Sequence, residues 1–177
     1  MHKGALRMSS KYKGNLDETD IYIIRKLCEN SNTPLACIGE ELNVSPSTVH
    51  KRINRLVDGG VIERFTILFD PVILDLKTVA FVGIELERSA LTGKKKEDVI
   101  SQLMSIPAVL EIYETLEPFD LMLKLRTSSV DTLREIIGNI SSIQGVLNTN
   151  TILTTKKIME TPLKYDVLKD IKGPNKN

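Results

Sequence analysis

Apolar residues in the first third of the chain recur every three or four positions within three short segments, and this spacing predicts three helices. The first helix begins after Asp17, whose side chain suits an N-cap, and ends near Asn30. Glu18 and Asp20 lie in its first turn, where carboxylates complement the helix dipole. We expect its buried side to consist of Ile21, Ile24, Leu27 and Cys28.

A short break joins the second and third segments. Thr33 is a candidate cap for a helix that starts at Pro34 and carries Leu35, Ile38 and Leu42 on its apolar side. Gly39 leaves room for another helix to approach closely, and Asn43 tolerates the left-handed conformation of a tight turn. A small residue, a turn residue four positions later and then a capped helix are typical of a helix-turn-helix unit.

The third segment, SPSTVHKRINRLVDGG (45–60), has start, buried-face and stop signals that agree. Ser45 is a good N-cap, Pro46 stands at the first helical position, and Gly59-Gly60 supplies a left-handed stop. A narrow apolar stripe is formed by Val49, Ile53 and Leu56. The other side is polar and positively charged, with no carboxylate before Asp58. Such a helix suits the DNA major groove, although a basic face is by itself more often a solvated surface.

After Gly60 the pattern changes to an alternation of period two. Residues 61–69 (VIERFTILF) are therefore predicted to form a strand or narrow ribbon, which Asp70-Pro71 ends. If this ribbon is a wing, Arg64 lies near a DNA backbone, although an exposed strand charge needs no such role. Residues 72–77 resemble a connector between two domains.

The second half of the chain alternates predicted strands (78–87, 109–116, 121–126, 146–155) with predicted helices (94–105, 129–140). This βαββαβ order is that of a ferredoxin-like sandwich, in which two helices cover one face of the sheet. We expect apolar groups on both faces, from Phe81, Ile84, Leu121, Leu123 and Leu125. The uncovered face would then be a large hydrophobic patch, which self-association about a two-fold axis would bury. A dimer also presents two recognition helices to two DNA half-sites.

Composition narrows the classes of partner. A chain of 177 residues with 41% hydrophobic content permits real cores, but a net charge of +1 does not identify a nucleic-acid binder. The absence of Trp argues against a stacking platform for single strands. Cys28 and Cys37 lack metal-ligand spacing, so we expect no disulfide, metal or cofactor. Because no apolar run is long enough to span a membrane, we expect a cytoplasmic protein associated with the nucleoid.

Three other functional classes account for fewer of these features. The only histidines are His2 and His50, and no nucleophile–base pair or phosphate loop can be assembled, which argues against an enzyme. A regulatory subunit that acts on another protein would leave the capped basic helix unexplained. An architectural protein that coats DNA with little sequence preference stays open as the main alternative.

The stretches LDETDIYIIRKL and LNVSPSTVHKRINRLVDGGVIERFTILFDP, followed by the βαββαβ half, resemble the leucine-responsive/asparagine-regulatory (Lrp/AsnC, or feast/famine) family of bacterial and archaeal transcription regulators. The resemblance extends from about Leu16 to about Lys157. It implies an α+β fold with an N-terminal winged helix-turn-helix and a C-terminal ferredoxin-like domain of the RAM type. It also implies a sequence-specific regulator that binds double-stranded DNA as a homodimer, tetramer or octamer, with an amino acid or related small molecule as effector.

The expected division of the chain is a flexible arm (1–15), the helix-turn-helix domain (16–62), a wing and linker (63–77), the dimerisation and effector domain (78–157) and a tail (158–177). By resemblance, the residues that read base edges or neighbouring phosphates are Ser47, Thr48, His50, Lys51 and Asn54. Arg52 and Arg55 match recurrent arginines of the family, and by resemblance they are also expected to bind DNA. Arg52 lies closest to the buried edge, so pairing with an acidic residue of the same unit is an equal alternative for it.

The candidate effector residues are Glu117, Phe119 and Asp120, in the hairpin between the second and third strands. The family usually has Gly-Asp-aromatic-Asp there, and binds an amino acid between dimers. In this chain Glu117 replaces the glycine, and Pro118, which has no N–H group, replaces the first acid. These two changes weaken carboxylate capture and favour an atypical, cationic ligand or no ligand.

Overall fold

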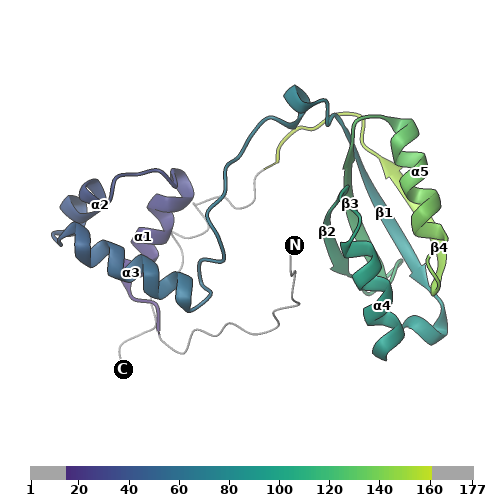
Figure 1. The fold of residues 1–177 in the computed structure, drawn as a ribbon, viewed down its shortest axis with the longest axis horizontal. Helices are drawn as coiled ribbons and strands as arrows, with labels where there is room; N and C mark the ends of the chain where they lie inside the picture. The colour runs from purple at the N-terminus through teal and green to yellow at the C-terminus, as the bar shows by residue number, and fades with distance from the viewer. Residues whose placement is uncertain (1–14, 161–177) are drawn as a thin grey trace. The chain divides into compact units, whose positions relative to one another are not determined.

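The computed structural model describes residues 15–160, which form two compact units (Figure 1). The boundary between the units lies between Leu68 and Phe69, inside the predicted linker, and the second unit comprises residues 69–158. The predicted arm, apart from Asn15, and the turn proposed around Tyr165 to Leu168 lie outside the described residues.

Three helices form the first unit, namely α1 (Glu18–Glu29), α2 (Leu35–Leu42) and α3 (Pro46–Asp58). Asp17 caps α1 as predicted, because its side chain accepts a hydrogen bond from the Asp20 N–H at 2.8 Å. The predicted cap of α2 is wrong. Pro34 occupies the cap position without a side-chain bond, and the Thr33 hydroxyl donates to the Asn30 carbonyl instead. Pro34 is itself extended, with ψ of 134°, so α2 begins at Leu35, one residue later than predicted, and Thr33 lies one position too early to cap it.

The turn between α2 and α3 has the geometry that its sequence predicts. Asn43 adopts the left-handed conformation with φ of 54°. Gly39 is buried where the following chain passes over the helix, and a Cβ atom built on it would lie only 2.6 Å from the Val44 carbonyl oxygen. The close approach of α2 to the start of α3 therefore requires glycine at this position.

The core of the first unit differs from the predicted one along α1. Its fully buried residues are Ile23, Ile38, Val49 and Leu56, with Ile53 nearly so; Ile24, Leu27 and Leu42 pack around them. Of the four residues predicted for the buried side of α1, Ile21 is buried and Ile24 and Leu27 pack against the core, whereas the prediction for Cys28 is wrong because Cys28 is exposed. Ile23, which is fully buried, was not predicted. The buried residues of α1 are Asp20, Ile21 and Ile23, so the inward side of the helix lies nearer its N-terminus than predicted.

The predicted strand over residues 61–69 is not formed, and with it the ribbon of a wing is absent from the described residues. The backbone there is irregular, and Phe65, Ile67, Leu68 and Phe69 are exposed. Alternation alone does not make a strand, because its N–H and C=O groups need a neighbouring strand to pair with. A short 3₁₀ helix, η1 (Pro71–Leu74), follows and is capped by Asp70.

The second unit has the predicted βαββαβ order, with β1 (Thr78–Leu86), α4 (Gly93–Met104), β2 (Val109–Glu114), β3 (Leu121–Thr127), α5 (Val130–Ser141) and β4 (Val146–Leu153). A 3₁₀ turn, η2 (Arg88–Ala90), precedes α4. All strand pairs are antiparallel in the order β2-β3-β1-β4. Helices α4 and α5 pack on one face of this sheet, so the ferredoxin-like prediction is confirmed (Figure 1).

The uncovered sheet face is mixed in character rather than a large hydrophobic patch. Ile84, Leu121, Leu123 and Leu125 all belong to the core beneath the helices, so of the five residues predicted to cover both faces only Phe81 lies on the uncovered one. Ile152 and Lys124 are its cross-strand neighbours. Lys124 pairs with Glu111 at 3.1 Å. Successive residues of a strand point to opposite faces of the sheet. The prediction failed because Ile84, Leu121, Leu123 and Leu125 all lie at positions that face the helices.

Candidate DNA-binding surface and effector hairpin

The N-terminus of α3 is organised by Ser45. Its hydroxyl accepts from the Thr48 N–H at 3.2 Å and lies 2.8 and 2.9 Å from the hydroxyls of Ser47 and Thr48. Because Pro46 has no N–H group and Ser45 satisfies the Thr48 N–H, the first turn is fixed before any ligand arrives. The sequence signals at both ends of this helix are confirmed, with Gly60 as the left-handed residue at φ of 74°.

One flank of α3 is exposed and unpaired. His50, Lys51 and Asn54 are exposed, and none of them makes a hydrogen bond or ion pair with the residues that the structure describes. They lie outside the stripe of Val49 and Ile53, which is buried. This flank therefore offers amide, imidazole and ammonium groups to a partner without breaking an internal interaction.

The opposite flank carries two arginines that are already paired with α1. The Arg52 Nη1 lies 2.6 Å from the carboxylate of Asp17 and 3.0 Å from that of Asp20, and the Arg55 Nη2 lies 2.5 Å from Asp20. The structure thus shows the internal pairing that was the alternative for Arg52. The pairing of Arg55 was missed, although carboxylates spaced by three on α1 and arginines spaced by three on α3 were a readable signal.

These ion pairs shift the pKa values of Asp17 and Arg52. Burial raises the pKa of Asp17, but hydrogen bonds from Arg52 and from the Asp20 N–H, together with the nearby arginine charges, hold that pKa below its usual 3.8. The hydrogen bond to Asp17 raises the pKa of Arg52. Both groups are charged at neutral pH, so the link between α1 and α3 is ionic.

The hairpin between β2 and β3 is tied to β1 by two of the three candidate effector residues. The Asp120 carboxylate accepts from the Leu86 N–H at 2.7 Å, and the Asp120 N–H donates to the Ile84 carbonyl at 2.9 Å. The Phe119 ring lies on Gly83, where a Cβ atom would be 2.3 Å from the ring. Glu117 is exposed and has no partner among the described residues.

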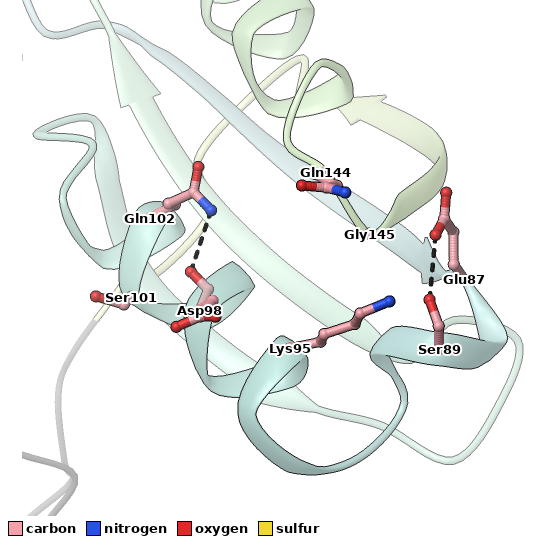
Figure 2. Close-up of a pocket in the computed structure, with 8 residues that line it drawn as sticks. All are labelled: Glu87, Ser89, Lys95, Asp98, Ser101, Gln102, Gln144 and Gly145. Carbon is pink, nitrogen blue, oxygen red and sulfur yellow. Dashed lines mark hydrogen bonds between the residues drawn. The ribbon is translucent and has the colours of Figure 1, made fainter.

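A separate cleft of about 490 Å³ lies between η2, α4 and the turn that precedes β4 (Figure 2). It was missed in the sequence because its polar residues come from three distant segments without a motif. Lys95 reaches into it from α4 (Figure 2). The residues around it include Glu87, Ser89, Lys95, Asp98, Gln102 and Gln144. None of the predicted effector residues lines this cleft.

Two further properties of the described residues bear on the class of protein. Within residues 15–160 there is no cluster of three or more side chains able to hold a metal ion. None of the helices in this part of the chain is both long and apolar enough to cross a membrane.

A helix-turn-helix unit with an exposed polar flank, followed by a ferredoxin-like unit, is typical of a DNA-binding protein with a separate regulatory domain. Comparison with known proteins identifies the family to which the chain belongs. Residues 16–57 match the AsnC-type helix-turn-helix domain, and residues 79–163 match the Lrp/AsnC ligand binding domain. The chain belongs to the Lrp/AsnC family of transcriptional regulators, and the function of this family is regulation rather than catalysis.

Relatives along nearly the whole chain support this assignment. The HTH-type transcriptional regulator FL11 of Pyrococcus furiosus is 35% identical over 149 residues, which are 84% of this chain and 95% of the relative. The regulator LysM of Saccharolobus solfataricus is 32% identical over 139 residues, covering 78% and 93%. The structure of E. coli AsnC is 26% identical with a TM-score of 0.74, covering 84% of this chain and 97% of that chain.

A regulator from Neisseria meningitidis, solved in complex with L-Met, has the same fold. It is 24% identical, with a TM-score of 0.76 over 86% of this chain and 99% of that chain.

Proposed function

We propose that this chain is a sequence-specific regulator that binds double-stranded DNA as a homodimer, with α3 in the major groove. The observation that carries the proposal is the exposed, unpaired flank of α3 formed by His50, Lys51 and Asn54. A flank of this kind is what base readout requires, because every buried donor or acceptor must find its partner on the DNA.

The residues of this flank have different roles in the proposal. Asn54 reads a base edge, since an amide can donate and accept in the pattern that adenine presents in the major groove. Lys51 contacts a phosphate, which its exposed ammonium group can neutralise on any duplex. Ser47 and Thr48 stand in the first turn, where the helix dipole and the hydroxyls favour a phosphate. His50 lies beside them on the exposed surface.

A single recognition helix reads too few base pairs for a unique operator, so two copies are needed. We assign dimerisation, and assembly into tetramers or octamers, to residues 78–157. The uncovered face of the sheet supports this role, because it carries the half-exposed Phe81 and Ile152 beside an internally neutralised Lys124–Glu111 pair. Binding to chromosomal operators would place the protein at the nucleoid.

The effector proposed for the hairpin is an amino acid or related small molecule with a positive charge. The Neisseria protein of the same fold was solved in complex with L-Met, which supports an amino acid as the class of effector. In this chain Phe119 and Asp120 are held against β1, so Glu117 is the hairpin side chain left to select a ligand. Its carboxylate favours a cationic partner.

The DNA-binding part of the proposal is tested by fluorescence anisotropy on selected and random duplexes across a range of salt concentrations. We expect Lys51→Ala to weaken binding to both duplexes and to lower the salt slope by about 0.9, the value for one lost phosphate contact. We expect Asn54→Ala to erode the preference for the selected site, by about 10- to 100-fold for a lost bidentate contact. Lys94→Ala, an exposed charge change in the second unit, is the matched control.

Unchanged discrimination by the Asn54 variant would contradict base reading by α3. A wild-type protein that binds selected and random duplexes equally would instead favour the alternative of an architectural protein that coats DNA. The effector is tested by calorimetric titration with the standard amino acids, with Glu117→Gln as the matched variant. Binding of leucine or glutamine that is tighter than that of lysine or arginine would refute the cationic assignment.

A further inference from the structure

The buried carboxylate of Asp20 is placed to control which charges of α3 can reach DNA. We propose that Asp20 is a positioning residue that holds Arg52 and Arg55 away from the phosphates, so that α3 binds DNA with fewer cations than its sequence contains. This inference rests on the proposed DNA-binding function of α3, and it changes the role expected for both arginines.

Asp20 is fully buried, and both of its oxygens are occupied. Oδ1 accepts from Arg52 at 3.0 Å, and Oδ2 accepts from Arg55 at 2.5 Å and from the Asp17 N–H at 3.2 Å. A carboxylate removed from water keeps its charge only if it is paired and hydrogen-bonded. The two guanidinium groups are therefore the counter-charge that this buried group requires.

The two arginines are held unequally. Arg52 is also bound by both oxygens of Asp17, at 2.8 and 2.6 Å, and 28% of its side chain is exposed. Arg55 has Asp20 as its single ion-pair partner among the described residues, and half of its side chain is exposed. Arg52 is thus fixed to α1 by two carboxylates, whereas Arg55 is held by one.

The helical period separates these arginines from Lys51 and Asn54. Arg52 and Arg55 share a flank of α3 with Thr48 of the first turn, whereas positions 47, 51 and 54 follow another flank. For Arg52 or Arg55 to reach a phosphate it would have to leave Asp20, and a buried charge would lose a partner. That loss outweighs a screened surface contact to phosphate, so the two arginines stay paired with the carboxylates of Asp17 and Asp20.

The consequence concerns specificity. Attraction to any duplex grows with the number of phosphates neutralised, whereas base contacts add only at the correct site. By neutralising two arginines internally, Asp17 and Asp20 lower the sequence-independent attraction and leave the base-reading flank unchanged. Asp20 thereby widens the ratio between operator and random DNA.

The test compares Asp20→Asn with Asp58→Asn in the full-length protein. Both variants remove one negative charge from the first unit, but Asp58 is exposed and forms no ion pair with the described residues. For Asp20→Asn we expect tighter binding to a random duplex and a salt slope steeper by about 0.9 to 1.8, as one or two arginines reach phosphates. Asp58→Asn is expected to leave the slope at the wild-type value.

A slope of the Asp20 variant equal to that of the wild type, in a protein that still binds its operator, would overturn this inference and leave the proposed function standing. A wild-type protein that binds no duplex would overturn the proposed function itself. A merely structural role for Asp20 would lower the binding-competent fraction without changing the slope.

Arg55→Gln decides the matter if Asp20→Asn does not fold. Arg55 lies at the surface, and its replacement by glutamine retains a donor to Asp20. We expect the salt slope of this variant to equal that of the wild type, because Arg55 does not contact phosphate. A decrease of about 0.9, as expected for Lys51→Gln, would overturn the inference.

Discussion

Replacing Gly39 with alanine isolates the cost of the close approach between α2 and α3. In most helix interiors this change is favourable, because alanine has the higher helix propensity by roughly 0.5–1 kcal/mol. At Gly39 the new Cβ atom would lie 2.6 Å from the Val44 carbonyl oxygen, which belongs to the backbone and cannot rotate away. The turn must shift, and it also holds the bond from the Val44 N–H to the Gly39 carbonyl at 2.9 Å.

The magnitudes decide the sign. Forcing a backbone shift in a packed region typically costs about 1–3 kcal/mol, which exceeds the propensity gain, so we expect a net destabilisation of about 1 kcal/mol. Gly138 is the matched control. It lies in the interior of α5, and a Cβ atom built on it would meet no atom within 4 Å. Gly138→Ala should therefore stabilise its helix by about 0.5–1 kcal/mol.

Hydrogen exchange followed by mass spectrometry measures both changes, because it reports the α2–α3 and α5 segments separately. We expect faster exchange in residues 35–58 of Gly39→Ala and slower exchange in residues 130–141 of Gly138→Ala. Equal or greater protection of the α2–α3 segment in the Gly39 variant would refute the steric argument. If exchange in residues 130–141 is not slower in Gly138→Ala, the helix-propensity difference between glycine and alanine is too small to measure in this protein.

Two further predictions concern the ionic link and the hairpin. The folded-state pKa of Asp17 is below 3.8, so its contribution to stability is complete above that value and is lost as pH falls below about 4. Acid titration of helicity in the wild type should show this loss of stability. In Asp17→Asn, the part of the loss that is due to protonation of Asp17 should be absent. Asp120→Ala leaves the Leu86 N–H without its acceptor and should cost about 1–3 kcal/mol in denaturant unfolding of the second unit. An unchanged midpoint would contradict the anchoring role of Asp120.

Local signals were sufficient for most of the architecture. The caps at Asp17 and Ser45, the left-handed Asn43 and the βαββαβ order all depend on residues within a few positions of one another, and the structure has each of them. The cap predicted at Thr33 failed because Pro34 is extended and α2 begins only at Leu35. The strand predicted over 61–69 failed because a period-two pattern does not specify a pairing partner.

The candidate site shows a different limit. Arg52 and Arg55 belong to a basic helix in the sequence, and their neutralisation depends on Asp17 and Asp20, more than thirty residues away along the chain. Similarly, Phe119 and Asp120 match a family motif that implies ligand contacts, and the motif alone does not indicate that both also contact β1. Residue type and spacing indicate what a side chain can bind, and only the fold shows what it already binds.

The seating of Phe119 on Gly83 links two positions that are far apart in the sequence. The ring occupies the volume that any side chain at residue 83 would need. Among descendants of this chain, a larger residue at 83 is therefore compatible with the same hairpin only if position 119 becomes smaller, and the two sites should change together. A substitution at 83 and a substitution at 119 that each disrupt the hairpin alone, but preserve it when combined, would demonstrate this coupling.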